Sequence, residues 1–345
     1  MKRDLYNSDL AADITPYLSN GSFDNMYDYV VDSVKYGDAV IGYPCGLEVP
    51  LLGFLTESLT GAGYDPATFK CETWDEYLEV AKKMTNDKIS GSSLYVYEYF
   101  LWPANWFQSN NAEPAVQNSD GTITLDFTNP KMIETLEFFK TLYSSGLTNE
   151  NITYTQISDM QSLMFNKKVA SFTFYPTWLE TFEANGFKAD DIFVSLFPKG
   201  PSYKAGTPAS NVIVSGAVFN ARKSPEELQA AVTYYEYMNG HEAFEDFSDF
   251  LIDKKITNFT LSPYKDIDWK TALTENGIPQ NWIDTTEAAL NEGYVSPLHS
   301  TAFTTYLTPQ FGGLIRDNTD MKAVLKSSQE TAEKEWLNYF NSYLK

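Results

Sequence analysis

Residues 36–56, YGDAVIGYPCGLEVPLLGFLT, contain two short apolar runs. Residues 40–43 form the first run, and Pro44, which cannot donate a hydrogen bond to a sheet, either ends this strand or places it at an edge. Residues 47–55 form the second run, which Glu48 interrupts. An acid between two apolar runs is either paired or placed at the mouth of a cleft, because burying a lone charge is costly. We therefore predict that the chain passes here from one lobe to another and that Glu48 faces the gap between them. A surface glutamate on an ordinary loop is the alternative.

The composition is that of an acidic globular chain. The 345 residues, 43% of them hydrophobic, are enough for two domains or one large one. The 25 basic against 46 acidic residues give a net charge of −21. This charge repels phosphate backbones and anionic lipids, so it disfavours nucleic acids and membrane surfaces as partners. Cys45 and Cys71 are the only cysteines, and we predict that they form no disulfide.

Strand and helix signals alternate along the chain. Thr73 and Glu76 form a capping box that opens a helix, and Pro130 and the Ser224-Pro225 pair open two more. Apolar runs predict strands at 169–174, 192–197 and 211–219. This alternation indicates an α/β protein.

Motifs for catalysis or cofactor binding are missing. The glycines at 200 and 206 lack P-loop spacing, and neither GxGxxG nor GxSxG occurs. The only histidines, His241 and His299, do not form a zinc-protease pattern. We therefore predict no cofactor and no metal. Paired carboxylates for glycoside hydrolysis stay open among 46 acids, with Glu48 as the first candidate.

Aromatic residues make up 15% of the chain and gather in two places. One cluster is interleaved with polar residues and consists of Tyr97, Tyr99, Phe100, Trp102, Trp106 and Phe107. In the other, Tyr175 and Trp178 bracket Pro176 just past a predicted strand end, where open α/β sheets place ligands. Flat aromatic faces pack against sugar rings, while polar side chains bind the hydroxyls. The competing interpretation is that each of these aromatic residues only fills the core. The sequence favours core packing most for Phe100 and Phe107 and least for Trp178.

Several segments together resemble the extracytoplasmic solute-binding proteins of ABC importers. They resemble in particular family 1, the carbohydrate-binding, maltose-binding-protein-like group. The resemblance runs along nearly the whole chain, through DLAADITPYL (9–18), AVIGYPCGLEV (39–49), TWDEYLEVAKKMT (73–85), YFLWP (99–103), MFNKKVASFTFYPTW (164–178) and KSPEELQAAVTYYEYM (223–238).

The resemblance implies a periplasmic-binding-protein-like fold of type II, in which two α/β lobes are joined by a hinge. Lobe 1 would comprise 1–44 and 212–296, and lobe 2 would comprise 45–211 and 297–345, with crossings near 43–45, 211–213 and 295–300. A monomer would bind a sugar or oligosaccharide between its lobes and deliver it to the membrane subunits of an ABC permease. Its location would be extracytoplasmic, on the cell surface as a lipoprotein or in the periplasm.

The resemblance also suggests roles for residues. Glu48 falls on a hydroxyl-binding carboxylate, Tyr99 and Tyr154 fall on ring-contacting tyrosines, and Trp178 falls on a stacking tryptophan. With the aromatic clusters, the predicted ligand-binding residues are Glu48, Tyr99, Trp102, Tyr154, Tyr175 and Trp178.

The chain departs from the family at three places. Thr304 stands where the family has a further stacking tryptophan, for which Tyr306 is a candidate substitute. Pro176 stands where the motif often has glycine. Residues 1–14, MKRDLYNSDLAADI, lack the apolar stretch of a signal peptide and lead directly into the DITPYL segment. The expectation is therefore that a signal and a first βαβ unit, on the order of a hundred residues, are absent from this chain.

Two other functions remain as alternatives at this stage. A carbohydrate-active enzyme would use Glu48 with a second carboxylate. A solute-binding protein of the same fold could instead take a peptide or a polyamine.

Overall fold

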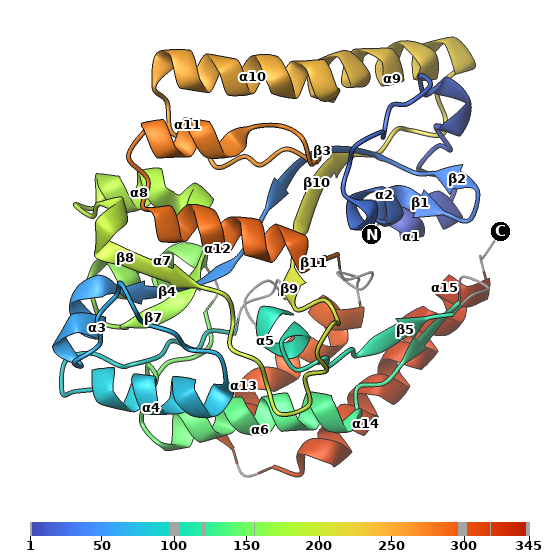
Figure 1. The fold of residues 1–345 in the computed structure, drawn as a ribbon. Helices are drawn as coiled ribbons and strands as arrows, with labels where there is room; N and C mark the ends of the chain where they lie inside the picture. The colour runs from blue at the N-terminus through green and yellow to red at the C-terminus, as the bar shows by residue number, and fades with distance from the viewer. Residues whose placement is uncertain are drawn as a thin grey trace.

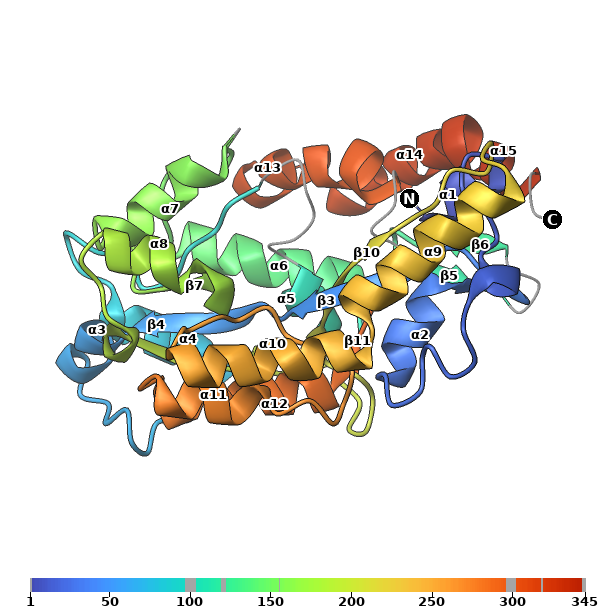
Figure 2. The ribbon, with the colours of Figure 1, turned by 90° about the horizontal axis from the view of Figure 1, so that it is seen from above.

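The computed structural model describes residues 2–96, 104–118, 122–154, 156–295, 302–317 and 319–342. Its elements form two groups, with β3 and β10 running between them (Figure 1). Helices α9 (Pro225–Asn239) and α10 (His241–Lys254) lie along the top, and from above they run end to end (Figure 2). Helices α4 (Trp74–Met84) and α6 (Pro130–Ser144) lie along the bottom.

The upper group has a small core of its own. Val34, Tyr43 and Val232 are among the buried residues of this core. The other elements of the group are α1 (Lys2–Asn7), η1 (Thr15–Tyr17), α2 (Asp28–Val34), β1 (Lys35–Tyr36), β2 (Ala39–Val40), β10 (Ile213–Ala217) and α11 (Trp269–Glu275).

The lower group is built on a three-stranded antiparallel sheet in the order β7-β4-β8, formed by β7 (Ser171–Phe174), β4 (Leu51–Leu55) and β8 (Ile192–Ser195). Around it lie α3 (Thr56–Gly61), α5 (Ala104–Gln108), β5 (Ala115–Gln117), β6 (Ile123–Leu125), α7 (Ile157–Phe165), η2 (Pro176–Trp178), α8 (Leu179–Ala184), η3 (Ala189–Asp191), α12 (Gln280–Asn291), the π-helical η4 (Ala302–Leu307), α13 (Thr308–Arg316), α14 (Met321–Ala332), the π-helical η5 (Glu333–Leu337) and α15 (Asn338–Ser342).

The stretch 36–56 connects the two groups. Strand β3 (Tyr43–Glu48) pairs antiparallel with β10, and after Val49 and Pro50 the chain becomes β4. Pro44 does not end the strand, and the prediction of an edge position is the correct one. It lies opposite Gly216, beside a register shift in a two-stranded pair, which is a position where strands tolerate proline.

The predicted helix starts are confirmed. The backbone N–H of Glu76 donates to the Thr73 hydroxyl at 3.3 Å, and the Glu76 carboxylate accepts from the Thr73 N–H at 3.0 Å. Ser224 and Glu227 form the same box at the start of α9. The two cysteines form no disulfide, as predicted.

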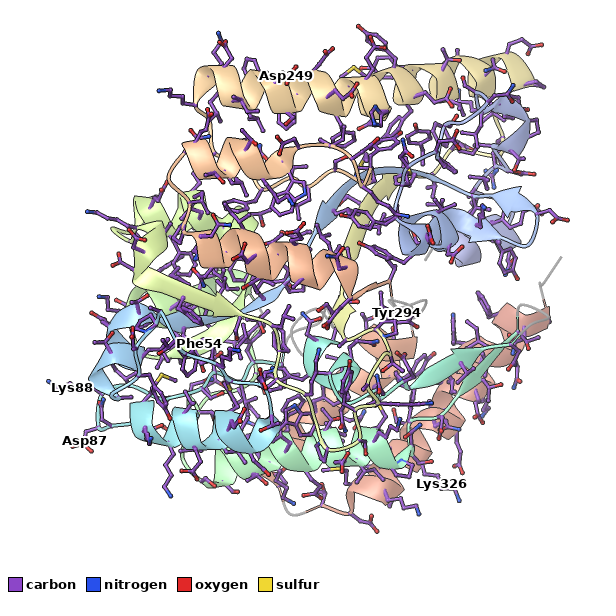
Figure 3. All side chains as sticks on the ribbon, viewed as in Figure 1. Phe54, Asp87, Lys88, Asp249, Tyr294 and Lys326 are labelled. Carbon is purple, nitrogen blue, oxygen red and sulfur yellow. The ribbon has the colours of Figure 1, made fainter. Side chains whose placement is uncertain are left out.

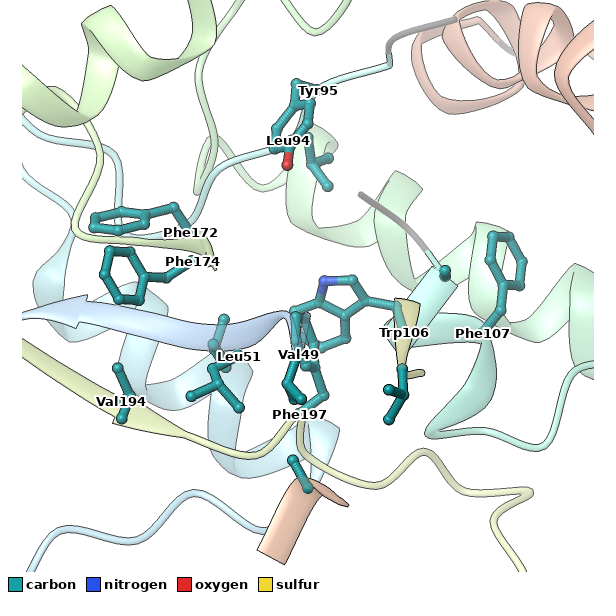
Figure 4. Packing of buried hydrophobic residues seen from close by; sticks show 14 of the residues in the cluster. Val49, Leu51, Leu94, Tyr95, Trp106, Phe107, Phe172, Phe174, Val194 and Phe197 are labelled. Carbon is teal, nitrogen blue, oxygen red and sulfur yellow. The ribbon is translucent and has the colours of Figure 1, made fainter. Parts of the chain in front are cut away.

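The main core packs around β4 (Figure 4). Trp106 is 3% exposed, and its ring centroid lies 4.9 Å from that of Tyr77 and 5.2 Å from that of Phe197. Core packing is therefore the right interpretation for Trp106 and for Phe107, which is also buried. Gly53 is required in this sheet, because a Cβ there would lie 2.8 Å from the Cβ of Phe174.

Trp282 packs helix α12 against the three-stranded sheet of the lower group. The indole N–H of this buried residue donates to the carbonyl of Ile192 at 2.8 Å, and its ring meets Phe174 edge-on at 4.9 Å. Residues 280–291 thus pack on β8, although they follow two helices of the upper group. The lobe boundaries stated above stay a prediction.

Asn105, on α5, links two strands where they pass between the groups. Its side-chain N–H donates to the carbonyl of Pro50 at 2.9 Å, and its side-chain oxygen accepts from the backbone N–H of Asn211 at 2.7 Å. Asn105 is 1% exposed, so water does not replace these bonds.

Replacing Asn105 by leucine is expected to lower the free energy of unfolding by ~2–4 kcal/mol, because it leaves a buried carbonyl and a buried N–H unpaired. Chemical denaturation measures the change. Asn185→Ala is the control, since that exposed amide bonds only within its own helix end, and it should shift stability by no more than ~0.5 kcal/mol. Equal effects of the two substitutions would contradict the linking role.

Candidate functional site

Three segments from distant parts of the sequence pair with one another near the junction of the two groups. Ile213, at the start of β10, is opposite Glu48 at the end of β3. Strand β9 (Ser210–Asn211) pairs in parallel with β11 (Gly293–Tyr294), which places Tyr294 beside Asn211. Figure 3 labels Tyr294 at this junction. The pairing therefore brings residues near 48, 211 and 294 together.

The alternation of strand residues places three polar side chains on one face. Glu48 and Ile213 are direct partners, so their side chains point the same way. Asn211 lies two residues before Ile213 and shares its face. Strand β4 pairs antiparallel with β7, and Leu51 lies opposite Phe174. Continuing this register by one residue sets Tyr175 beside Pro50, which is two residues after Glu48. Strand alternation, continued through Val212 and through residues 49–50, thus points Glu48, Asn211 and Tyr175 toward one side.

Glu48 is half-buried, and its carboxylate accepts a hydrogen bond from the hydroxyl of Thr177. Thr177 lies between Pro176 and Trp178 in the short helix after β7. This bond ties the acid on one connecting strand to the turn that carries the aromatic pair. We did not predict a role for Thr177, since one threonine in a turn has no sequence signal of its own.

Tyr175 and Trp178 form a pair directly after β7. Their ring centroids lie 4.7 Å apart at an interplanar angle of 41°. The backbone N–H of Trp178 donates to the backbone carbonyl of Tyr175 at 2.8 Å. Tyr175 is buried, whereas Trp178 is half-buried. Burial raises the pKa of the Tyr175 phenol, and the negative charge of Glu48 raises it further. The phenol therefore stays protonated and can donate a hydrogen bond.

Tyr95 adds a further aromatic ring to this group. Burial, followed by the proximity of Tyr175, raises the pKa of the Tyr95 phenol well above its ordinary value. No role was predicted for this residue from the sequence, although it lies two positions before the first aromatic cluster. The neighbouring Val96 pairs with the 152–154 segment, where the Tyr154 N–H donates to the Val96 carbonyl at 3.0 Å.

The remaining predicted residues are distributed as follows. The hydroxyl of half-buried Tyr154 donates to the Asn151 carbonyl at 2.6 Å, so this bond already occupies its proton, and a role for the ring stays a prediction. Tyr306 lines a groove together with Gln310 and with Ser327 of α14. Tyr99 and Trp102 lie outside the described residues.

The described ranges contain no group of three or more His, Cys, Asp or Glu side chains arranged to hold a metal ion. Within the same ranges, no helix is both long enough and apolar enough to cross a membrane. The side chains described above offer one carboxylate, one amide and hydroxyls for hydrogen bonding, beside aromatic rings.

Comparison with solved structures identifies the fold. A putative oligosaccharide periplasmic-binding protein from Synechococcus has a TM-score of 0.73 at 14% identity, over 100% of this chain and 84% of that one. The substrate-binding protein Lmo0181 from Listeria monocytogenes, in complex with cycloalternan, has a TM-score of 0.74 at 17% identity, over 96% and 82%. Maltose-bound MalE3 from T. maritima has a TM-score of 0.73 at 17% identity, over 98% and 82%. The fold is that of the type II periplasmic-binding proteins, as predicted.

Comparison with sequences identifies the family. No curated protein matches. The profile of the bacterial extracellular solute-binding proteins matches residues 2–243. Proteins of this family bind substrates and are not enzymes, which removes the glycosidase alternative, and they act outside the cytoplasm. The chain therefore belongs to the bacterial extracellular solute-binding proteins of ABC transporters.

Proposed function

We propose that this protein binds a sugar or an oligosaccharide between two lobes and delivers it to the permease subunits of an ABC importer. The observation that carries the proposal is the aromatic pair of Tyr175 and Trp178, joined through Thr177 to the carboxylate of Glu48. An aromatic face covers the apolar side of a sugar ring, while a carboxylate accepts hydrogen bonds from its hydroxyls. The cycloalternan and maltose complexes of two structural neighbours support this ligand class.

The mechanism follows from the position of these groups on the connecting strands. Lobe 1 is proposed to comprise 1–44 and 212–296, and lobe 2 to comprise 45–211 and 297–345. A ligand that contacts both lobes only when they are closed shifts the population toward the closed state. The permease would recognise that state, with the monomeric protein acting in the periplasm or as a lipoprotein on the cell surface.

Titration with sugars tests this function. Maltose, maltotriose, cycloalternan and tagatose are added separately while intrinsic tryptophan fluorescence is recorded, and calorimetry confirms each affinity. We expect a saturable shift with at least one sugar, because the indole of Trp178 would leave water on binding. Putrescine and a tripeptide serve as comparison ligands. Saturation by one of these, with no response to any sugar, would contradict the proposal.

A further inference from the structure

We infer that the side chains of Asn211 and Tyr175 form a hydrogen-bonding pair that selects a neutral ligand with two adjacent hydroxyls. This inference rests on the proposed function, because it assigns the substrate class of the same site. It adds Asn211, which is not among the residues predicted above to bind the ligand, and it adds a requirement for an uncharged ligand.

The two side chains are buried and their polar atoms lack partners. Asn211 is 1% exposed, and neither its side-chain oxygen nor its side-chain nitrogen makes a hydrogen bond. Tyr175 is 4% exposed, and its hydroxyl likewise makes none. Buried polar atoms of natural proteins are nearly always bonded, and exceptions call for an explanation.

Local structure does not account for these unpaired atoms. The backbone N–H of Asn211 is already satisfied by Asn105 at 2.7 Å, and the backbone carbonyl of Tyr175 accepts from Trp178 at 2.8 Å. These two main-chain groups are thus hydrogen-bonded, while the polar atoms of the two side chains are buried without a partner. Strand alternation, continued from the Ile213–Glu48 and Leu51–Phe174 pairs, points Asn211 and Tyr175 toward the side of Glu48, where the proposed ligand would contact all three.

An amide presents one acceptor and two donors side by side. One ligand hydroxyl can donate to the Asn211 oxygen while its neighbour accepts from the Asn211 nitrogen, and this geometry matches two adjacent hydroxyls on a sugar ring. The Tyr175 phenol, which stays protonated, can bond a third oxygen. A ligand that lacks these hydroxyls would leave the buried atoms unpaired, and such sites reject analogues strongly.

Charge restricts the ligand further. Of the residues assigned to this site, Glu48 is the one acidic side chain, and it accepts a hydrogen bond from the Thr177 hydroxyl. A carboxylate or phosphate on the ligand would be repelled by Glu48 without a cation among these residues to offset it. The site therefore favours a neutral sugar over its acidic derivative.

The test combines two substitutions with two matched controls. Tyr175→Phe removes only the hydroxyl, and Asn211→Leu removes the amide at similar volume. Asn7→Leu is the control for Asn211, because Asn7 is 5% exposed, its amide also lacks partners and it lies at the end of α1. Tyr77→Phe is the control for Tyr175, because the Tyr77 hydroxyl bonds Ser92 and Ser171 in the core.

Calorimetry measures the affinity of each variant for maltose, for maltobionate and for any neutral sugar of the panel that binds more tightly than maltose. The midpoint of thermal unfolding is recorded separately, without ligand. We expect Asn211→Leu and Tyr175→Phe each to lose at least ~10-fold in affinity for the neutral sugar, which is ~1.4 kcal/mol. Their ligand-free midpoints should not fall, because the atoms removed have no partner to lose. Both controls should keep wild-type affinity, and maltobionate should bind at least ~10-fold more weakly than maltose.

The outcomes separate the inference from the proposed function. If the wild type binds a sugar and both site variants bind it equally well, the selection by Asn211 and Tyr175 is wrong while the function stands. A lower thermal-unfolding midpoint of Asn211→Leu without ligand would also overturn the inference, since it would show that the Asn211 amide stabilises the folded protein. Saturation by a peptide or polyamine alone would reject both.

Discussion

Replacing Trp178 by alanine is expected to weaken sugar binding by ~30-fold to ~1000-fold, which corresponds to ~2–4 kcal/mol. The half-buried indole lies 4.7 Å from the ring of Tyr175 and presents a large flat surface to the site. Its loss removes the stacking surface and admits water to the hydrogen bonds beside it. Calorimetric titration with the best sugar of the panel measures the change.

Two further variants make this result specific. Trp178→Phe keeps a flat ring and should retain most of the affinity. Trp269→Ala truncates another half-buried tryptophan, at the start of α11, and should leave binding unchanged. Wild-type affinity in Trp178→Ala would reject the assignment of the site to this turn.

Replacing Trp282 by alanine is expected to lower the free energy of unfolding by ~3–5 kcal/mol. Trp282 is fully buried, packs edge-on against Phe174 and bonds the Ile192 carbonyl, so truncation opens a cavity and leaves that carbonyl without its donor. Urea denaturation followed by circular dichroism measures the change. Trp282→Phe fills most of the space and should cost less.

The same substitution tests the architecture, because Trp282 joins α12 to the sheet whose strand β7 leads into Tyr175. A loss of packing at Trp282 should therefore also weaken sugar binding. Trp282 itself is not assigned to the site. A loss below ~1 kcal/mol would show that α12 does not depend on this anchor, in contrast to what a buried tryptophan ordinarily contributes.

Much of the fold could be predicted from the sequence because its signals are local. The capping boxes at Thr73 and Ser224 act within four residues, so they specify helix starts whatever surrounds them. The family could likewise be recognised, because its segments keep their order along the chain. The sequence also marked Glu48, Tyr175 and Trp178, and the structure places these three together.

The tertiary structure alone decided which other side chains join them. Asn211 is 163 positions after Glu48, by the difference of their numbers, and it comes near Glu48 because Ile213, two residues after Asn211, pairs with Glu48. Trp106 and Asn105 are adjacent in sequence, yet one fills the core and the other bonds two connecting strands. Pairing and burial depend on contacts between distant segments, and a period or a motif within one segment does not encode them.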